Sequence, residues 1–316
     1  MKGLELAERY YHTVCAPMMA EKFPHQLERI ATGLVGEGSE CYGYDDELSR
    51  DHDWGAAVCL WLTADDYDSF GQELTDAVAE LPANFLGYPA RLVSSLGQGR
   101  TGVMKIDSFY AKFLGVSGVP TMLAQWRRIP EHHLAAATNG KVFTDPVGAF
   151  SAIREALLVD YYPEDIRKKK LAARCLTAAQ AGQYNYLRVV RRGEFVAAHL
   201  AVGEFIKAVS SMTYLLNKRY QPFYKWIHRG LRDLPFLGEA IAARLTKLVT
   251  GGANLGEQVI YEYQSDIIEE ICLFLIAELR RQGLTDSTST FLLDHGMNIH
   301  NTIQDPALRA SNPWVE

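Results

Sequence analysis

One polar loop, residues 36–54, constrains the fold of this chain more than any other stretch. Short apolar segments at 30–35 and 56–62 flank it, and their length and composition predict two buried β-strands. Asp51 and Asp53 lie two residues apart near its end, so on an extended chain their carboxylates leave the same face. Two such charges repel each other unless a hard divalent cation such as Mg²⁺ lies between them. The loop therefore predicts a metal site beside the second strand.

The same loop begins with residues that suit a phosphate group. Gly38 allows backbone N–H groups to approach a ligand closely, and the Ser39 hydroxyl can donate to a phosphate oxygen. Together with the paired carboxylates, these residues predict a phosphate-binding turn next to a metal ion. An ordinary acidic turn is the alternative interpretation.

The spacing within this loop is specific, with eleven residues between Ser39 and Asp51. The pattern Gly-Ser-x-x-x-Gly followed by Ser-x-Asp-x-Asp is carried by Gly38, Ser39, Gly43, Ser49, Asp51 and Asp53. It resembles the nucleotidyltransferase superfamily, which has the DNA polymerase β-like fold. The surrounding Tyr44-Asp45-Asp46 and Asp51-His52-Asp53-Trp54 look like the DUF4037 group of that superfamily, and a weaker similarity runs through residues 217–226.

The resemblance implies an α+β protein in which an N-terminal polymerase β-like domain with a mixed sheet precedes an all-α helical bundle. The aminoglycoside nucleotidyltransferases have this layout. We place the boundary near Pro146, which gives a catalytic domain at residues 1–145 and a bundle at 146–316 that would close over the substrate and the nucleotide.

The resemblance also implies a Mg²⁺-dependent nucleotidyltransferase. Such an enzyme transfers a nucleoside monophosphate, with AMP from ATP as the expected case, to a hydroxyl of an acceptor and releases pyrophosphate. Two Mg²⁺ ions would bind Asp51 and Asp53, while Gly38 and Ser39 would hold the outer phosphates. Asp107 is the best local candidate for a third metal-binding carboxylate; a solvated strand residue is the alternative. The sequence does not identify the acceptor or the preferred nucleobase.

A second glycine pattern, Gly97-x-Gly99-x-x-Gly102, has a different interpretation. A dinucleotide-binding loop must open a helix, whereas strand-like residues follow this one. We predict a hairpin that joins strands at 90–96 and 103–109, and Asp107 would then share a strand face with Lys105.

Composition narrows the classes of function. The 316 residues carry a net charge of -6, so there is no general electrostatic attraction to nucleic acid. Five scattered cysteines predict reduced thiols, and the sequence shows neither a signal peptide nor a membrane-spanning apolar run. These features predict a cytoplasmic protein, without a membrane partner and with nucleic acid disfavoured.

From Pro163 onward the apolar residues recur with helical spacing and predict a bundle of about five helices. The longest pattern covers 185–220, and its one weak point is Gly193, where a glycine suggests close approach of another element. We interpret Lys168-Lys169-Lys170 as a solvated helix face.

The bundle carries a cluster of cations and aromatic side chains at residues 218–229. A lysine can contact phosphate and an aromatic ring can stack on a base. We predict that Lys225 contacts the triphosphate and that Tyr224 or Trp226 lies near the nucleotide. Alternatively, the aromatic residues belong to the bundle core and the cations to its rim.

Glu194 is the candidate general base for the acceptor hydroxyl, the role that kanamycin-type nucleotidyltransferases give to a bundle glutamate; an ordinary surface residue is the alternative. Arg192 and His199 also match the loose Arg–His spacing of HEPN ribonuclease domains. Two other functions stay open. One is a non-catalytic nucleotide-binding regulator, and the other, which the Arg–His spacing suggests, is a toxin–antitoxin-like fusion with a HEPN-like bundle.

Overall fold

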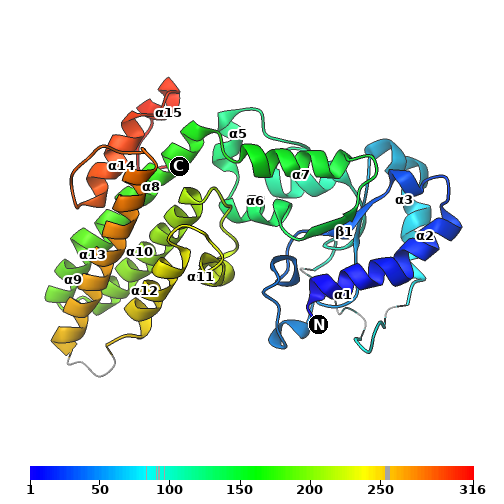
Figure 1. Ribbon diagram of the computed structural model, residues 1–316, viewed down its shortest axis with the longest axis horizontal. Helices are drawn as coiled ribbons and strands as arrows, with labels where there is room; N and C mark the ends of the chain where they lie inside the picture. Colours follow the sequence, from blue (N-terminus) through cyan, green and yellow to red (C-terminus); the bar gives the residue numbers. More distant parts are fainter. Residues whose placement is uncertain (83, 90, 92, 96, 253–256) are drawn as a thin grey trace. The chain divides into compact units, whose positions relative to one another are not determined.

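The computed structural model describes the whole chain apart from residues 83, 90, 92, 96 and 253–256, and it is α+β (Figure 1). The chain divides into two compact units, Met1–Tyr161 and Tyr162–Glu316. The first unit holds the sheet, and every secondary-structure element of the described second unit is helical. The division falls later than the predicted boundary near Pro146, because Phe150 of α7 (Ala149–Asp160) stacks on Trp61 in the core of the first unit.

The sheet is mixed, with strand order β3-β2-β1-β4 among the described residues. Its strands are β1 (Ala31–Leu34), β2 (Cys59–Leu62), β3 (Gly102–Lys105) and β4 (Lys141–Thr144). β1 pairs antiparallel with both β2 and β4, so the two predicted strands around the polar loop are confirmed, and β4 forms an edge of the sheet.

The predicted hairpin is wrong, because β3 pairs parallel with β2. A parallel pair needs a crossover connection, and α3 (Ala64–Ala79) supplies it. Thr63 caps this helix by accepting a hydrogen bond from the Asp66 N–H at 3.2 Å. Residues 91 and 93–95 have no strand structure, whereas 90, 92 and 96 lie outside the described residues.

Helices cover both faces of this sheet. Side chains alternate along β2, so neighbouring residues of this strand pack against helices on opposite faces. Leu60 and Leu62 pack on the side of the N-terminal helices and α3, and Trp61 points to the opposite side, where Phe150 stacks at 3.8 Å between ring centroids. The N-terminal helical segment runs through α1 (Gly3–Tyr10), η1 (Tyr11–Cys15) and α2 (Ala16–Lys22). The remaining elements of this unit are η2 (Leu27–Arg29), η3 (Glu40–Tyr42), η4 (Leu48–Arg50), α4 (Ile106–Leu114), α5 (Leu123–Arg128) and α6 (Glu131–Thr138).

The second unit is a helical bundle in which α8 packs against α10 and α14. Its elements are α8 (Glu164–Ala178), η5 (Ala179–Tyr186), α9 (Leu187–Arg191), α10 (Phe195–Leu216), η6 (Tyr224–Trp226), α11 (Ile227–Leu231), α12 (Gly238–Thr250), α13 (Glu257–Arg281), α14 (Leu292–Asn301) and α15 (Pro306–Ala310). By length and composition, α10 is the one described helix that could cross a membrane, with a mean hydropathy of 1.3. Core helices of soluble proteins meet the same criterion, and 39% of the apolar window is buried within the bundle.

Two predictions for the bundle are wrong. The long helix at 185–220 breaks between α9 and α10, and a Cβ on Gly193 would meet no atom within 4 Å. This glycine serves backbone geometry, because its φ of +75° ends α9, and not close packing.

The lysines of α8 are not a solvated face, since Lys169 and Lys170 are buried. Lys169 donates to the carbonyl of Asn312 at 2.7 Å, and Lys170 donates to the Glu316 carboxylate at 2.8 Å. The segment that contains Asn312 and Glu316 lies against α8, which removes these ammonium groups from water.

Candidate functional site

The loop after β1 turns sharply at two glycines. Gly36 and Gly38 have φ values of +132° and +135°, a region in which side chains are strained. Asn139 clamps the first of them: its Oδ1 accepts from the Gly36 N–H at 2.9 Å, and its Nδ2 donates to the Gly36 carbonyl at 2.8 Å. The next residue, Gly140, donates its N–H to the Cys41 carbonyl at 2.8 Å. The turn before β4 thus holds the loop at Gly36 and at Cys41, on either side of residues 37–40.

The fixed loop leaves polar groups available. The backbone N–H groups of Glu37, Gly38 and Ser39 donate to no other residue that the structure describes, and the same holds for the Ser39 hydroxyl. Backbone N–H groups in folded proteins are almost always satisfied by protein, water or a ligand. Consecutive N–H groups in a turn form a common site for anions. The predicted phosphate-binding residues Gly38 and Ser39 therefore lie in a loop suited to that role.

A buried ion pair connects this loop to Arg91. Glu40 and Arg91 lie 3.1 Å apart, and their side chains are only 4% and 7% exposed. Burial raises the pKa of the Glu40 carboxyl, and the positive charge of Arg91 opposes that rise. A Cβ on Gly38 would lie 2.6 Å from the Glu40 carboxylate, so the glycine also permits a close approach.

The second half of the polar loop is anchored to the start of the chain. The Asp45 carboxylate accepts from the Gly3 N–H at 2.7 Å and from the Trp54 indole N–H at 3.1 Å. These contacts give Asp45 a structural role, although it belongs to the motif that suggested the DUF4037 resemblance.

Asp51 and Asp53 do not lie on an extended strand, because β2 begins only at Cys59 and residues 51–53 form bends. Asp51 is exposed, and its carboxylate accepts from the backbone N–H of His52 at 2.9 Å. Asp53 is buried, with a φ of +52° that is unusual for a residue with a side chain. The shared face that the Asp-x-Asp spacing predicts is thus absent from this conformation.

The Asp53 carboxylate is bound within the protein. It accepts from the Ser94 N–H at 2.8 Å and the Ser94 hydroxyl at 2.6 Å, and it pairs with Arg100 at 3.2 Å. Burial acts to raise the pKa of Asp53, but the bonds from Ser94 and the charges of Arg100 and Arg91 outweigh it, so the pKa lies below its usual value. Asp53 is therefore an ionised carboxylate that is already satisfied.

Asp107 is not on a strand, because β3 ends at Lys105 and α4 begins at Ile106. It is exposed in the first turn of α4 and does not share a strand face with Lys105. Across the described residues, no group of three or more His, Cys, Asp or Glu side chains is arranged to hold a metal ion. As placed here, Asp51, Asp53 and Asp107 do not fit a two-metal site.

The predicted residues of the bundle lie in the second unit. Tyr224 is 74% exposed in η6, which excludes it from the bundle core. Lys225 is exposed too, and its ammonium lies 5.2 Å from the centroid of the half-buried Trp226 ring. The three residues form a surface cluster, and the alternative of core aromatic residues with rim cations does not describe Tyr224.

Glu194 is exposed and lies immediately before α10, in the break after Gly193, and not inside a helix. Arg192 lies in the same break and His199 on α10, and both are exposed.

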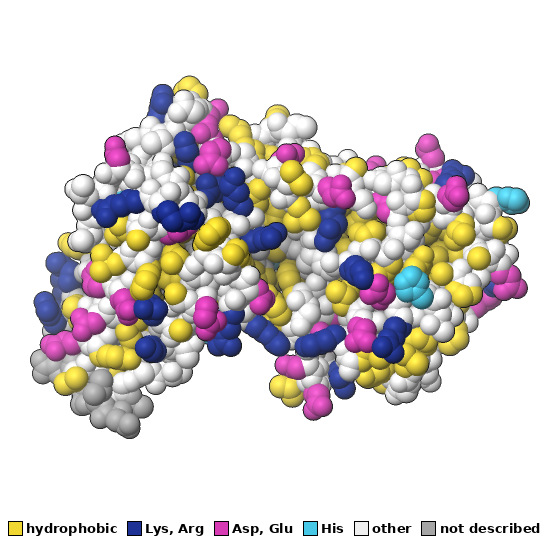
Figure 2. Space-filling model, in the orientation of Figure 1, with side chains coloured by type: hydrophobic (Ala, Val, Ile, Leu, Met, Phe, Trp, Pro, Cys, Tyr) yellow, Lys and Arg dark blue, Asp and Glu magenta, His cyan; other side chains and the backbone are white. Residues whose placement is uncertain are grey.

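Acidic and basic side chains are interspersed over the face drawn in Figure 2, in keeping with the modest net charge.

Several residues that contact the loop are not predicted from sequence. Asn139 is one of them, although an Asn side chain that can both donate and accept is well suited to clamp a peptide group. The other omissions are the cations that pair with the loop acids: Arg91, Arg100 and Lys112. Their distance along the chain from residues 36–54 left no local signal.

One family model matches the chain: the domain described as "Domain of unknown function (DUF4037)" is detected at residues 126–227. The DUF4037 resemblance seen in the sequence is thereby supported, over a range that includes Asn139 and Tyr224–Trp226 but begins after the Gly36–Ser39 loop. No curated protein and no solved structure matches the chain.

Proposed function

We propose that the protein is a nucleotidyltransferase of the polymerase β-like class, with ATP or another nucleoside triphosphate as the donor. One observation carries the proposal: the backbone N–H groups of Glu37, Gly38 and Ser39 donate to no described residue, in a turn that Asn139 holds in place. Three such donors beside a serine hydroxyl suit the oxygens of a phosphate group. The motif around them is the one that resembles the nucleotidyltransferases.

The proposed reaction forms one bond and breaks one. The hydroxyl oxygen of the acceptor bonds to the α-phosphorus while the bond from that phosphorus to the bridging oxygen breaks, and pyrophosphate leaves. Gly38 and Ser39 hold the outer phosphates. Lys225, with Tyr224 or Trp226, is the further nucleotide-binding element of the proposal, and Glu194 accepts the proton of the acceptor hydroxyl.

The proposed reaction includes a Mg²⁺ requirement. Asp51 and Asp53 are the residues that the motif assigns to Mg²⁺, with Asp107 as the third. Because Asp53 is satisfied by Ser94 and Arg100, these carboxylates do not form a metal site as placed. This disagreement favours a second candidate function, nucleotide binding without transfer.

A thermal-shift titration with ATP, GTP, CTP and UTP, each with and without Mg²⁺, tests the proposal. A ligand that binds only the folded protein stabilises it by roughly 2.7 kcal/mol at about 100 times its dissociation constant. We expect a shift with at least one nucleotide and a smaller one in Ser39→Ala and in Lys225→Ala.

Absence of a shift with all four nucleotides would contradict both candidate functions. A shift that Asp53→Asn leaves unchanged, without pyrophosphate release, would favour the non-catalytic regulator. An unchanged shift in folded Lys225→Ala would remove the second-unit cluster from the nucleotide site.

A further inference from the structure

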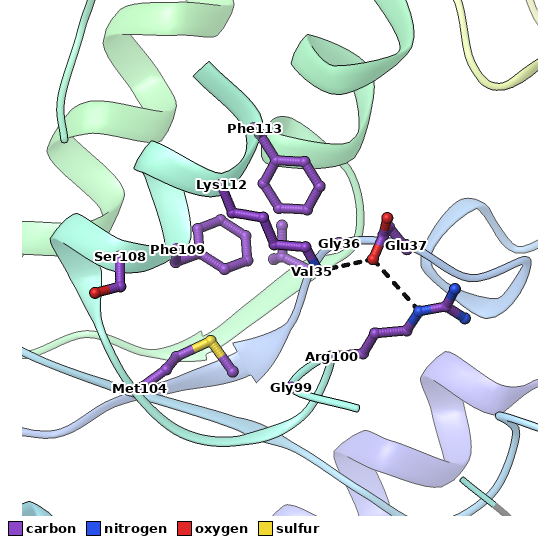
Figure 3. A pocket seen from close by; sticks show the side chains of 10 residues that line it. All are labelled: Val35, Gly36, Glu37, Gly99, Arg100, Met104, Ser108, Phe109, Lys112 and Phe113. Atoms are coloured by element: carbon purple, nitrogen blue, oxygen red, sulfur yellow. Dashed lines mark hydrogen bonds and ion pairs between the residues drawn. The ribbon is translucent and has the colours of Figure 1, made fainter. Parts of the chain in front are cut away.

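A small cavity adjoins the Gly36–Ser39 loop in the first unit (Figure 3). It has a volume of about 110 Å³, and its apolar walls come from Val35, Met104, Phe109 and Phe113. Apolar cavities of roughly 150 Å³ hold one benzene molecule. This cavity therefore accommodates a group of a few carbon atoms and is too small for a nucleobase.

The mouth of the cavity is charged. Lys112 of α4 donates to the Glu37 carboxylate at 2.7 Å, and Arg100, in the loop before β3, places its Nε 3.3 Å from the same oxygen. The Arg100 contact is an ion pair without the alignment of a hydrogen bond, and this buried Nε has no hydrogen-bond partner among the described residues. The Glu37 carboxylate thus lies between two cations, with a hydrogen bond from Lys112 and only an ion pair with the Nε of Arg100.

Another anion can displace the Glu37 side chain from its position between Lys112 and Arg100. Its side chain is 41% exposed, and it lies between Gly36 and Gly38, whose backbones reach conformations closed to other residues. An exposed ion pair such as Glu37–Lys112 contributes little to stability, because water solvates both charges well. Arg100 keeps Asp53 as a partner at 3.2 Å when Glu37 leaves. An incoming anion therefore meets little resistance at the mouth.

We propose that this cavity is a second binding site, separate from the nucleotide site, for a small molecule with a short apolar body and one anionic group. The apolar body fills the space between Met104 and Phe109, and the phosphate or carboxylate replaces Glu37 between Lys112 and Arg100. Figure 3 shows the Glu37 side chain between these two cations. This site goes beyond nucleotide binding and does not depend on it.

Butyl phosphate and pentanoate are suitable probes, with inorganic phosphate and 1-butanol as controls that carry one half of the ligand each. Binding is followed through the amide signals of Gly36 and Gly99, which line the cavity, in ¹⁵N-glycine-labelled protein. We expect both probes to bind more tightly than either control. Glu37→Gln should bind them about fivefold more tightly, because the resident charge is gone, and Lys112→Met about fivefold more weakly.

The charge-conserving Lys112→Arg variant is the matched control and should retain binding. Failure of both probes to bind wild type and Glu37→Gln would overturn the proposal, as would an affinity that Glu37→Gln lowers. Displacement of butyl phosphate by ATP in a competitive manner would assign the cavity to the nucleotide and overturn its separate role. Probe binding without any nucleotide binding would leave this site standing while the proposed transferase fails.

Discussion

Replacing Arg91 with methionine is expected to destabilise the first unit by about 3–5 kcal/mol at neutral pH. The Glu40–Arg91 pair is almost completely buried, so removal of the cation leaves a carboxylate in the interior without its counter-charge. Methionine fills much of the space of the arginine stem, which separates the effect of charge from that of a cavity. Urea denaturation that reports the free energy of unfolding measures it.

The double variant Glu40→Gln/Arg91→Met is the matched control and should recover most of the loss, because it removes both charges. The pH dependence has a definite sign. Burial already raises the pKa of Glu40, and loss of Arg91 raises it further, so the folded state favours the protonated acid. The deficit of Arg91→Met should therefore shrink as the pH falls toward 4 and grow as it rises. A deficit independent of pH, or no rescue in the double variant, would contradict the buried ion pair.

Asn139→Ala is expected to cost roughly 2–4 kcal/mol and to abolish nucleotide binding. Two hydrogen bonds hold Gly36, and their loss leaves a backbone N–H and a carbonyl unsatisfied at a partly buried turn. The loop that carries Glu37, Gly38 and Ser39 would then lose its fixed geometry. Stability is measured by denaturation, and binding by the nucleotide titration.

Asn139→Asp is the matched control. It keeps an acceptor for the Gly36 N–H but loses the donor to the Gly36 carbonyl, so both effects should be intermediate. Normal nucleotide affinity in a folded Asn139→Ala protein would show that the clamp does not position the site.

The polar loop itself was predictable from sequence because its signals are local. The apolar segments around it and the glycines within it appear in the structure where the sequence predicts them. The pairing of β3 was not predictable in the same way. A strand segment looks alike in parallel and antiparallel pairs, and here the crossover helix α3 decides in favour of the parallel pair.

The failures share a physical cause, which is that partners distant in sequence decide the environment of a side chain. The sequence predicts that Lys169 and Lys170 are solvated, but in the structure residues 311–316 cover them. The metal ligation of Asp53 stays a prediction, but the bonds that Ser94 and Arg100 make to its carboxylate have no local signal in the sequence. Gly193 was correctly identified as a weak point, yet its role depends on φ, which the spacing of apolar residues does not report.

The most direct test of the account is the amide signal of Gly38 in ¹⁵N-glycine-labelled protein during a titration with ATP in the presence of Mg²⁺. If the N–H groups of Glu37, Gly38 and Ser39 bind phosphate, the Gly38 amide proton moves downfield and saturates with the ATP concentration. Gly115, at the end of α4, should stay unchanged. A Gly38 signal that does not move while ATP binds, or an absence of ATP binding, would contradict the phosphate-binding loop.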